Sequence, residues 1–233
     1  MNQTDNEKLI RFWNSVFVLD DEDLKDMPAE GWRELAPSEK LFDAAKELGK
    51  CKKVLDYGCG SGWAGIITAK SGCMDVTAAD AAEEALRSTG QYASIYNVDQ
   101  IIHTVKADND WLRSIPDQTY DGLFCSNVLD VIPEETAISI IREFARIVTN
   151  DANVVIGMNY YMSEQEASDK GLELTDHKCL YIDGILRMVS RTDEEWTRIF
   201  SPYFTLTSLD HFAWDGEKTE RRRLFHLKKA NEK

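Results

Sequence analysis

Long apolar runs, paired cysteines and a basic leader segment are all missing from this chain of 233 residues. No apolar stretch approaches the ~20 residues that a membrane-spanning helix needs. The first residues are polar and acidic, without the basic and then apolar pattern of a secretory signal, so we expect a cytoplasmic protein. The five cysteines are odd in number and form no C-x-x-C pair, which argues against disulfides and a structural zinc site, and we expect no metal.

Positive charge is scarce as well. The 27 Lys and Arg residues are outnumbered by 41 Asp and Glu residues, which gives a formal net charge of −14. A field of this sign repels polyanions and anionic lipid surfaces, so we expect neither a nucleic-acid nor a membrane partner. Hydrophobic residues make up 43% of the chain and aromatic residues 10%, which excludes a disordered protein. A chain of this length is expected to form one full-sized domain.

Proline and glycine are few, at 5 and 13 residues, and helical and strand patterns alternate between them. Such alternation is typical of an α/β fold with a largely parallel sheet that is covered on both faces. The apolar spacing predicts helices at residues 38–48, 63–71, 82–96 and 134–148. It predicts strands at residues 53–56, 75–79, 101–106, 120–125 and 153–158.

The alternation breaks at residues 160–190, where a polar and acidic stretch is followed by apolar CLYIDGILRMV. We interpret this segment as an inserted cap or hairpin. The sequence Thr192-Asp193-Glu194-Glu195 has the spacing of a capping box and predicts a short helix through Phe200. Two closing strands are predicted at 204–209 and 222–227. The Arg221-Arg222-Arg223 run lies on the last strand and is interpreted as a solvated edge.

The strongest chemical signal is VLDYGCGSG at residues 54–62, an apolar strand that ends in Asp56 and leads into three alternating glycines. Glycine lets the backbone turn tightly and approach a ligand, and the next helix points its N–H groups there. Residues 60–65 also satisfy the dinucleotide pattern G-x-G-x-x-G. Asp56 before the first glycine favours a cationic ligand over a pyrophosphate. Asp80 and Asp108 can accept hydrogen bonds from ribose hydroxyls and an adenine amine, so the set outlines an adenosine with a cationic tail.

The order of these features resembles the class I S-adenosylmethionine-dependent methyltransferases, in particular types 11 and 25. The resemblance covers residues 38–158 and, more loosely, the final two strands. It implies an α/β fold with a doubly wound, mostly parallel, seven-stranded sheet of Rossmann-like form. It also implies S-adenosyl-L-methionine as the cofactor and S-adenosyl-L-homocysteine as the product.

The resemblance assigns roles to individual residues of this chain. In the family, the acid and the glycine loop hold the amino acid part of the cofactor, the acid after the second strand binds the ribose, and polar residues after the third strand bind the adenine. Residues 120–129 are similar to the fourth-strand motif, whose end faces the methyl group. The implied cofactor-binding residues are Asp56, Gly58, Gly60, Trp63, Asp80, Ala81, Asp108, Asn109 and Ser126, with Arg33 as a candidate partner for the cofactor carboxylate.

A methyl group on a sulfonium is already activated, so the protein mainly has to hold the acceptor in line with it and exclude water. An alcohol or ammonium acceptor must also lose a proton, which a positioned side chain assists. Asp130 and Tyr161 are the catalytic candidates, because strands four and five end beside the methyl group in the family. Trp13, Tyr160 and His177 are candidate substrate-binding residues.

We therefore expect a single methyltransferase domain that acts on a small-molecule acceptor by in-line displacement, as a monomer or homodimer. Its parts are an N-terminal helical lid at 1–37, a cofactor-binding core at 38–158, a cap insertion at 159–190, and a closing helix and strands at 191–233. The fourth-strand motif lacks the Asn/Asp-Pro-Pro-aromatic sequence of base methyltransferases. A protein methyltransferase, an NAD-dependent oxidoreductase and a catalytically inactive cofactor-binding subunit remain alternatives.

Overall fold

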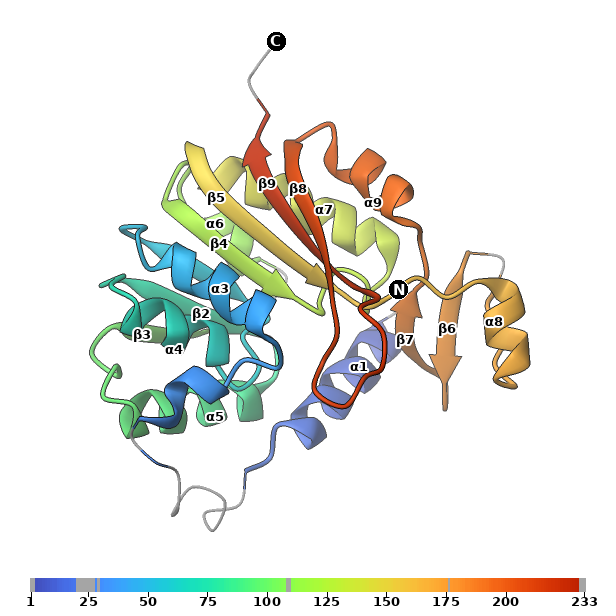
Figure 1. The fold of residues 1–233 in the computed structure, drawn as a ribbon, viewed down its shortest axis with the longest axis horizontal. Helices are drawn as coiled ribbons and strands as arrows, with labels where there is room; N and C mark the ends of the chain where they lie inside the picture. The colour runs from blue at the N-terminus through green and yellow to red at the C-terminus, as the bar shows by residue number, and fades with distance from the viewer. Residues whose placement is uncertain (1–2, 20–27, 29, 108–109, 176, 231–233) are drawn as a thin grey trace.

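The computed structural model describes residues 3–19, 28, 30–107, 110–175 and 177–230. Its centre is a seven-stranded sheet in the order β3-β2-β1-β4-β5-β9-β8 (Figure 1). The strands of this sheet are β1 (Val54–Tyr57), β2 (Val76–Asp80), β3 (Ile102–Lys106), β4 (Tyr120–Ser126), β5 (Val148–Met158), β8 (Phe204–Phe212) and β9 (Arg222–Lys229). The helices near it are α3 (Glu39–Leu48), α4 (Trp63–Lys70), α5 (Glu83–Ile95), α6 (Trp111–Ser114), α7 (Glu134–Ile147) and α9 (Asp193–Phe200).

The strands β1 to β5 are parallel to one another, whereas β9 is antiparallel to both β5 and β8. The predicted doubly wound, mostly parallel, seven-stranded sheet is therefore confirmed. The strand order reverses at β1, which has β2 on one side and β4 on the other. In sheets of this kind, ligands bind outside the carboxyl ends of the strands at such a reversal.

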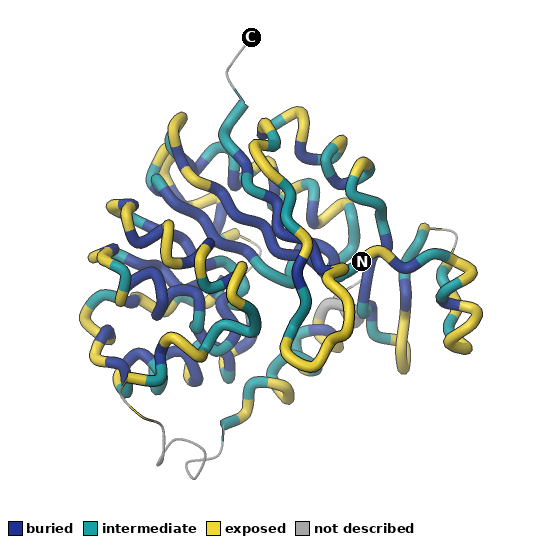
Figure 2. Tube along the Cα trace, viewed as in Figure 1, coloured by how far each residue is buried: buried dark blue, intermediate teal, exposed yellow. Residues whose placement is uncertain are grey.

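Helices cover both faces of the sheet, so that its central strands are buried (Figure 2). One hydrophobic cluster joins α3, α4 and α5 to the sheet, and a second joins α7 and α9 to its opposite face. The apolar stripe predicted for α7 is confirmed, because its buried residues are Ala137, Ile141, Phe144 and Ile147. This three-layer arrangement leaves the loops at the carboxyl ends of the strands to form a site.

Two predicted helix starts are confirmed in atomic detail. The side chain of Ser38 accepts a hydrogen bond from the backbone N–H of Leu41 and so begins α3. Thr192 and Glu195 form the reciprocal capping box that begins α9. Each cap satisfies backbone donors that the first turn of a helix leaves without an intrahelical partner.

Between β5 and α9 the chain leaves the sheet and forms α8 (Glu164–Asp169) and a hairpin of β6 (Cys179–Ile182) and β7 (Ile185–Val189). The insertion is closed near its base by Ser190, whose hydroxyl donates to the carbonyl of Met162 and accepts from its N–H. Helix α1 (Gln3–Val16) lies below the sheet in Figure 1, between α5 and β7. The expected roles of α1 as a lid and of the insertion as a cap stay predictions.

The structure corrects the interpretation of the arginine run. Strand β9 lies between β5 and β8, so it is not an edge of the sheet. Arg222 is 7% exposed and Arg223 is 1% exposed, and only Arg221 lies in an exposed position. The expectation of a solvated edge was wrong because the position of a strand within a sheet depends on long-range pairing, which the charge pattern does not encode. The helix α6 was not predicted, and β5 and β8 are longer than expected.

Candidate functional site

The glycine-rich loop between β1 and α4 lies at the reversal of strand order. Gly58, Gly60 and Gly62 have positive φ angles of +70°, +55° and +79°. Side chains rarely adopt this conformation, and a Cβ atom would collide with Val128 at Gly58 and lie 2.6 Å from Thr89 at Gly62. The loop therefore requires glycine at these positions, as its alternating pattern in the sequence suggested.

Asp80 ends β2 beside this loop. One carboxylate oxygen accepts the N–H of Gly60 at 3.0 Å, and the other accepts the N–H of Ala82 at 2.8 Å. Desolvation by burial raises the pKa of Asp80, and the backbone hydrogen bonds oppose this rise. Each carboxylate oxygen has a second lone pair, so Asp80 can brace the loop and still accept ribose hydroxyls.

Asp56, at the end of β1, is 3% exposed. Its carboxylate accepts the N–H of Gly65 at 2.9 Å and so ties the strand to the first turns of α4. Burial raises the pKa of Asp56 from 3.8 to about 7, and the nearby charge of Asp80 adds to the rise. The structure thus gives Asp56 a bracing contact, while its predicted contact with the cofactor stays a prediction.

The ends of β4 and β5 are joined by polar side chains. The hydroxyl of Ser126 donates to the side-chain oxygen of Asn127 at 3.0 Å. The amide of Asn127 donates in turn to the side-chain oxygen of Asn159, also at 3.0 Å. Asn127 has a φ of +57°, a left-handed conformation that asparagine tolerates better than most residues. This arrangement ties the backbone at the end of β4 to the residue that follows β5.

Asn159, directly after β5, is held from three sides. Its N–H donates to a carboxylate oxygen of Asp130 at 2.7 Å, and its carbonyl accepts from Arg223 at 2.7 Å. Its side-chain oxygen accepts from Arg222 at 2.7 Å. Asp130 is fully buried, and this burial raises its pKa, while the Asn159 hydrogen bond and the Arg223 charge oppose the rise. Asp130 therefore positions Asn159, and its predicted role as a proton acceptor stays a prediction.

Helix α1 reaches the glycine loop through its C-terminal end. The ring of Phe17 lies 2.9 Å from the place that a Cβ atom on Gly60 would take. The side-chain oxygen of Asn14 accepts the N–H of Glu84 in the first turn of α5 at 3.1 Å. The predicted substrate-binding residue Trp13 stacks on Phe17 with ring centroids 6.2 Å apart. The structure thus brings α1 to the loop.

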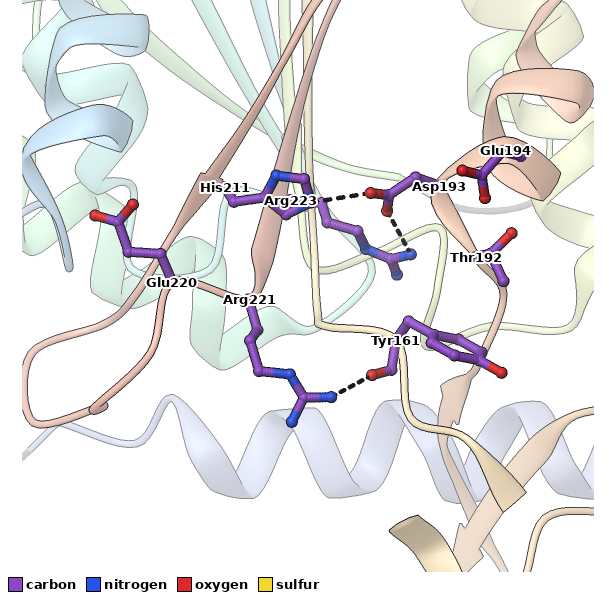
Figure 3. Close-up of a pocket in the computed structure, with 8 residues that line it drawn as sticks. All are labelled: Tyr161, Thr192, Asp193, Glu194, His211, Glu220, Arg221 and Arg223. Atoms are coloured by element: carbon purple, nitrogen blue, oxygen red, sulfur yellow. Dashed lines mark hydrogen bonds and ion pairs between the residues drawn. The ribbon is translucent and has the colours of Figure 1, made fainter. Parts of the chain in front are cut away.

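A cavity of about 370 Å³ lies on the other side of β5 (Figure 3). It is lined by Tyr161, Thr192, Asp193, Glu194, His211, Glu220, Arg221 and Arg223. In it, Asp193 pairs with the His211 ring at 2.9 Å and with Arg223 at 3.4 Å. Tyr161, a predicted catalytic residue, is 37% exposed here, and its carbonyl accepts from Arg221. The glycine loop does not line this cavity, and β4 and β5 lie between the two places in the sheet.

The remaining predicted site residues are scattered. Trp63 begins α4 and packs edge-on against Phe124. Ala81 follows Asp80 and is half-buried, and its predicted contact with the cofactor stays a prediction. Arg33 is exposed, with its guanidinium 4.6 Å from the ring centroid of Trp32, and no described contact connects it to the glycine loop.

Two predicted residues belong to the insertion, and two fall outside the described part of the chain. Tyr160 is half-buried beneath the guanidinium of Arg221, at 4.6 Å from its ring centroid, and His177 is exposed. Asp108 and Asn109, the predicted adenine-binding residues, lie outside the described residues. Within the described ranges, no group of three or more His, Cys, Asp or Glu residues could hold a metal ion, and no helix could cross a membrane.

Sequence reasoning missed Asn159, Phe17 and the two buried arginines of β9. Asn159 carried a signal, because a polar residue directly after a parallel strand is a common ligand position, as Asp80 already illustrated. Nothing in the sequence around Phe17 predicted that its ring lies beside Gly60. The sequence contains no signal that Arg222 and Arg223 are buried, because a run of three arginines on a strand is typical of a solvated edge.

Residues 54–151 match the family model described as a methyltransferase domain. This segment contains the glycine loop, Asp80 and the end of β4. The match covers 98 of the 233 residues of the chain, and over this segment the chain is similar to a methyltransferase domain.

Among curated relatives of this chain, the ubiquinone biosynthesis O-methyltransferase of Neisseria meningitidis serogroup C is 25% identical over 151 residues. The match covers 65% of this chain and 58% of that relative, so the chain matches little more than half the length of the relative. The same values hold for the protein of the same name from serogroup A.

Solved methyltransferase structures share the fold over most of their length. The N-methyltransferase NodS from Bradyrhizobium japonicum, solved with S-adenosylhomocysteine, has a TM-score of 0.63 at 16% identity, and the match covers 96% of this chain and 99% of that one. The 1,6-didemethyltoxoflavin-N1-methyltransferase of Burkholderia thailandensis has a TM-score of 0.67 at 15% identity, with 97% and 90% covered. At these identities the likeness concerns the fold.

Proposed function

We propose that this protein binds S-adenosylmethionine at the loop between β1 and α4 and transfers its methyl group to a small-molecule acceptor. The observation that carries the proposal is the pairing of the glycine loop with Asp80, whose carboxylate accepts the N–H of Gly60 at 3.0 Å. The same segment, residues 54–151, matches the methyltransferase family model.

The residues of the loop fit such a cofactor. The positive φ angles of Gly58 and Gly60 turn the loop tightly at the reversal of strand order, the place where sheets of this kind bind ligands. Asp80 has lone pairs left for two ribose hydroxyls, because its backbone contacts use one on each oxygen. S-adenosylmethionine supplies a methyl group on a positively charged sulfur, and nearby carboxylates suit that charge.

The chain's own residues orient the partners and exclude water. The Ser126-Asn127 segment and Asn159 hold the ends of β4 and β5 rigid beside the loop, so that the acceptor can be held in line. Phe17 covers Gly60 and keeps water from the loop. Where the acceptor is an alcohol or ammonium, a side chain must take a proton, and Tyr161 and Asp130 remain our candidates.

A small molecule is favoured as the acceptor by the net charge of −14, which repels nucleic acids. The curated relative is named for an O-methyltransferase of ubiquinone biosynthesis, and a structural neighbour holds the small molecule 1,6-didemethyltoxoflavin. Both names are consistent with an acceptor of low molecular mass. A basic protein tail would also suit an acidic surface, so a protein substrate remains the alternative.

The test uses S-adenosylmethionine labelled in its methyl group, incubated with the protein and a cell extract that has been divided into metabolites and macromolecules. We expect the label to enter the metabolite fraction. Label in proteins alone would contradict a small-molecule acceptor and support the alternative. Binding of the cofactor without transfer in either fraction would identify an inactive cofactor-binding subunit.

A further inference from the structure

Arg187, on β7 of the insertion, has no acidic partner among the residues that the structure describes. Its carbon Cζ lies 3.7 Å from the ring centroid of Phe12 on α1. Its Nε atom is buried and makes no hydrogen bond to any described residue. Within the described ranges, no carboxylate lies within ion-pair distance of it, although acids outnumber bases in this chain by 41 to 27. A buried donor of this kind calls for a partner, and the residues that the structure describes do not supply one.

The arginines near this part of the fold are already neutralised. Arg221 makes a two-pronged contact with Glu166, at 2.7 and 2.8 Å. Arg222 pairs with Glu217 at 2.8 Å. Arg187 differs from these arginines because none of its N–H donors contacts a carboxylate of a described residue.

Arg187 lies near the proposed cofactor site because α1 connects the two. Phe12, on which Arg187 stacks, and Phe17, which covers Gly60, are five residues apart on α1 and its immediate continuation. At about 1.5 Å per residue, the helix rises about 7.5 Å between them, which is the length of a small organic molecule. Figure 1 shows α1 passing from α5 to β7 along this path.

Strand β7 is also fixed to the end of the fourth strand. The N–H of Val189 donates to the carbonyl of Asp130 at 2.7 Å. Asp130 follows β4, and its side chain holds Asn159 at the end of β5. Arg187, two residues before Val189, is thus placed between α1 and the ends of the strands that face the acceptor in the proposed reaction.

Arg187 contacts Phe12 over the face of the aromatic ring, with Cζ 3.7 Å from the ring centroid. The N–H donors of a guanidinium lie in its own plane. These donors form a fork that matches the two oxygens of a carboxylate or phosphate. We propose that Arg187 binds an anionic group, a carboxylate or a phosphate, on the methyl acceptor. This inference rests on the proposed function and narrows its substrate class.

The test measures binding of simple probes to the protein saturated with S-adenosylhomocysteine. Benzoate, phenyl phosphate and neutral benzamide are titrated and followed by ligand-observed NMR. We expect at least one of the two anions to bind about tenfold more tightly than benzamide, because it adds charge-assisted hydrogen bonds. Preference for benzoate would indicate a carboxylate, and preference for phenyl phosphate a phosphate.

Single-residue variants test whether Arg187 causes the preference for anions over benzamide. Arg187→Met keeps an unbranched side chain but removes the guanidinium and should abolish the preference for anions, whereas Arg187→Lys should retain part of it. Arg198→Met removes an equal charge from an exposed position on α9 and should leave the preference unchanged. The affinity for S-adenosylhomocysteine should stay within about twofold in all three variants, since none of these side chains belongs to the glycine loop.

Two results would overturn the inference: equal binding of benzamide and both anions by the wild-type protein, or an unchanged preference in Arg187→Met. The first does not depend on the folding of any variant. Failure of S-adenosylhomocysteine to bind would instead count against the proposed function, and the anion titrations repeated without it would still report on Arg187.

Discussion

Replacing Asp80 perturbs the proposed cofactor site at its most informative point. Its carboxylate accepts the N–H groups of Gly60 and Ala82 and, in our account, two ribose hydroxyls. Hydrogen bonds to charged groups are worth about 1.5–3 kcal/mol each. Loss of even one such bond predicts that Asp80→Ala weakens binding of S-adenosylhomocysteine about 10- to 150-fold. Asp80→Asn, which keeps a carbonyl acceptor, should lie between Asp80→Ala and the wild type.

The assay is isothermal titration with S-adenosylhomocysteine, and Asp75→Asn provides the control. Asp75 precedes the other end of β2, where its carboxylate lies 3.0 Å from the ammonium of Lys53. Asp75→Asn removes the same charge beside the other end of β2, away from the glycine loop. The affinity for S-adenosylhomocysteine should therefore stay within about twofold of the wild type. Unchanged affinity in Asp80→Ala would refute the reasoning, because it would mean that this carboxylate contacts no part of the cofactor.

Three further predictions concern the buried charges and the loop. Burial raises the pKa of Asp56 from its ordinary value of 3.8 to about 7 in the folded protein, so the contribution of Asp56 to stability falls as the pH rises from about 4 to 7. Asp56→Asn should therefore raise the melting temperature more at pH 8 than at pH 5, and an equal change at both would contradict the assignment. Arg223→Met should lower the free energy of unfolding by about 3–5 kcal/mol in urea denaturation, because the buried carboxyl group of Asp130 loses its positively charged neighbour. Arg221→Met serves as the control, because Arg221 is exposed and its replacement should lower the free energy of unfolding by at most about 1 kcal/mol. Equal losses of stability in Arg221→Met and Arg223→Met would refute the argument from burial. Gly60→Ala should weaken S-adenosylhomocysteine binding about tenfold, because it strains a φ of +55° and presses on Phe17, and an unchanged titration would contradict that geometry.

The elements that the sequence predicted well are those with local causes. The capping box at Thr192 and Glu195 depends on two side chains and the backbone between them, so its spacing is sufficient to place the start of α9. The glycine loop also has a local cause, because residues without a Cβ atom adopt the positive φ angles of Gly58 and Gly60 most readily. Helix and strand periodicity then predicted the class of the fold.

The parts that the sequence did not predict depend on contacts between distant residues. Arg223 is buried because β9 inserts between β5 and β8, and its partners Asn159 and Arg191 lie 64 and 32 residues away. The stacking of Arg187 on Phe12 joins the insertion to the N-terminal helix. Such pairings are set by the packing of the whole chain, and a charge pattern within one strand does not contain them.

The central claim, that the glycine loop of this chain binds S-adenosylmethionine, has a direct test. Isothermal titration of the wild-type protein with S-adenosylmethionine, S-adenosylhomocysteine and NADH distinguishes the methyltransferase from the dinucleotide interpretation of the loop. Our account predicts saturable one-to-one binding of the first two ligands and none of NADH. Binding of NADH alone would contradict it.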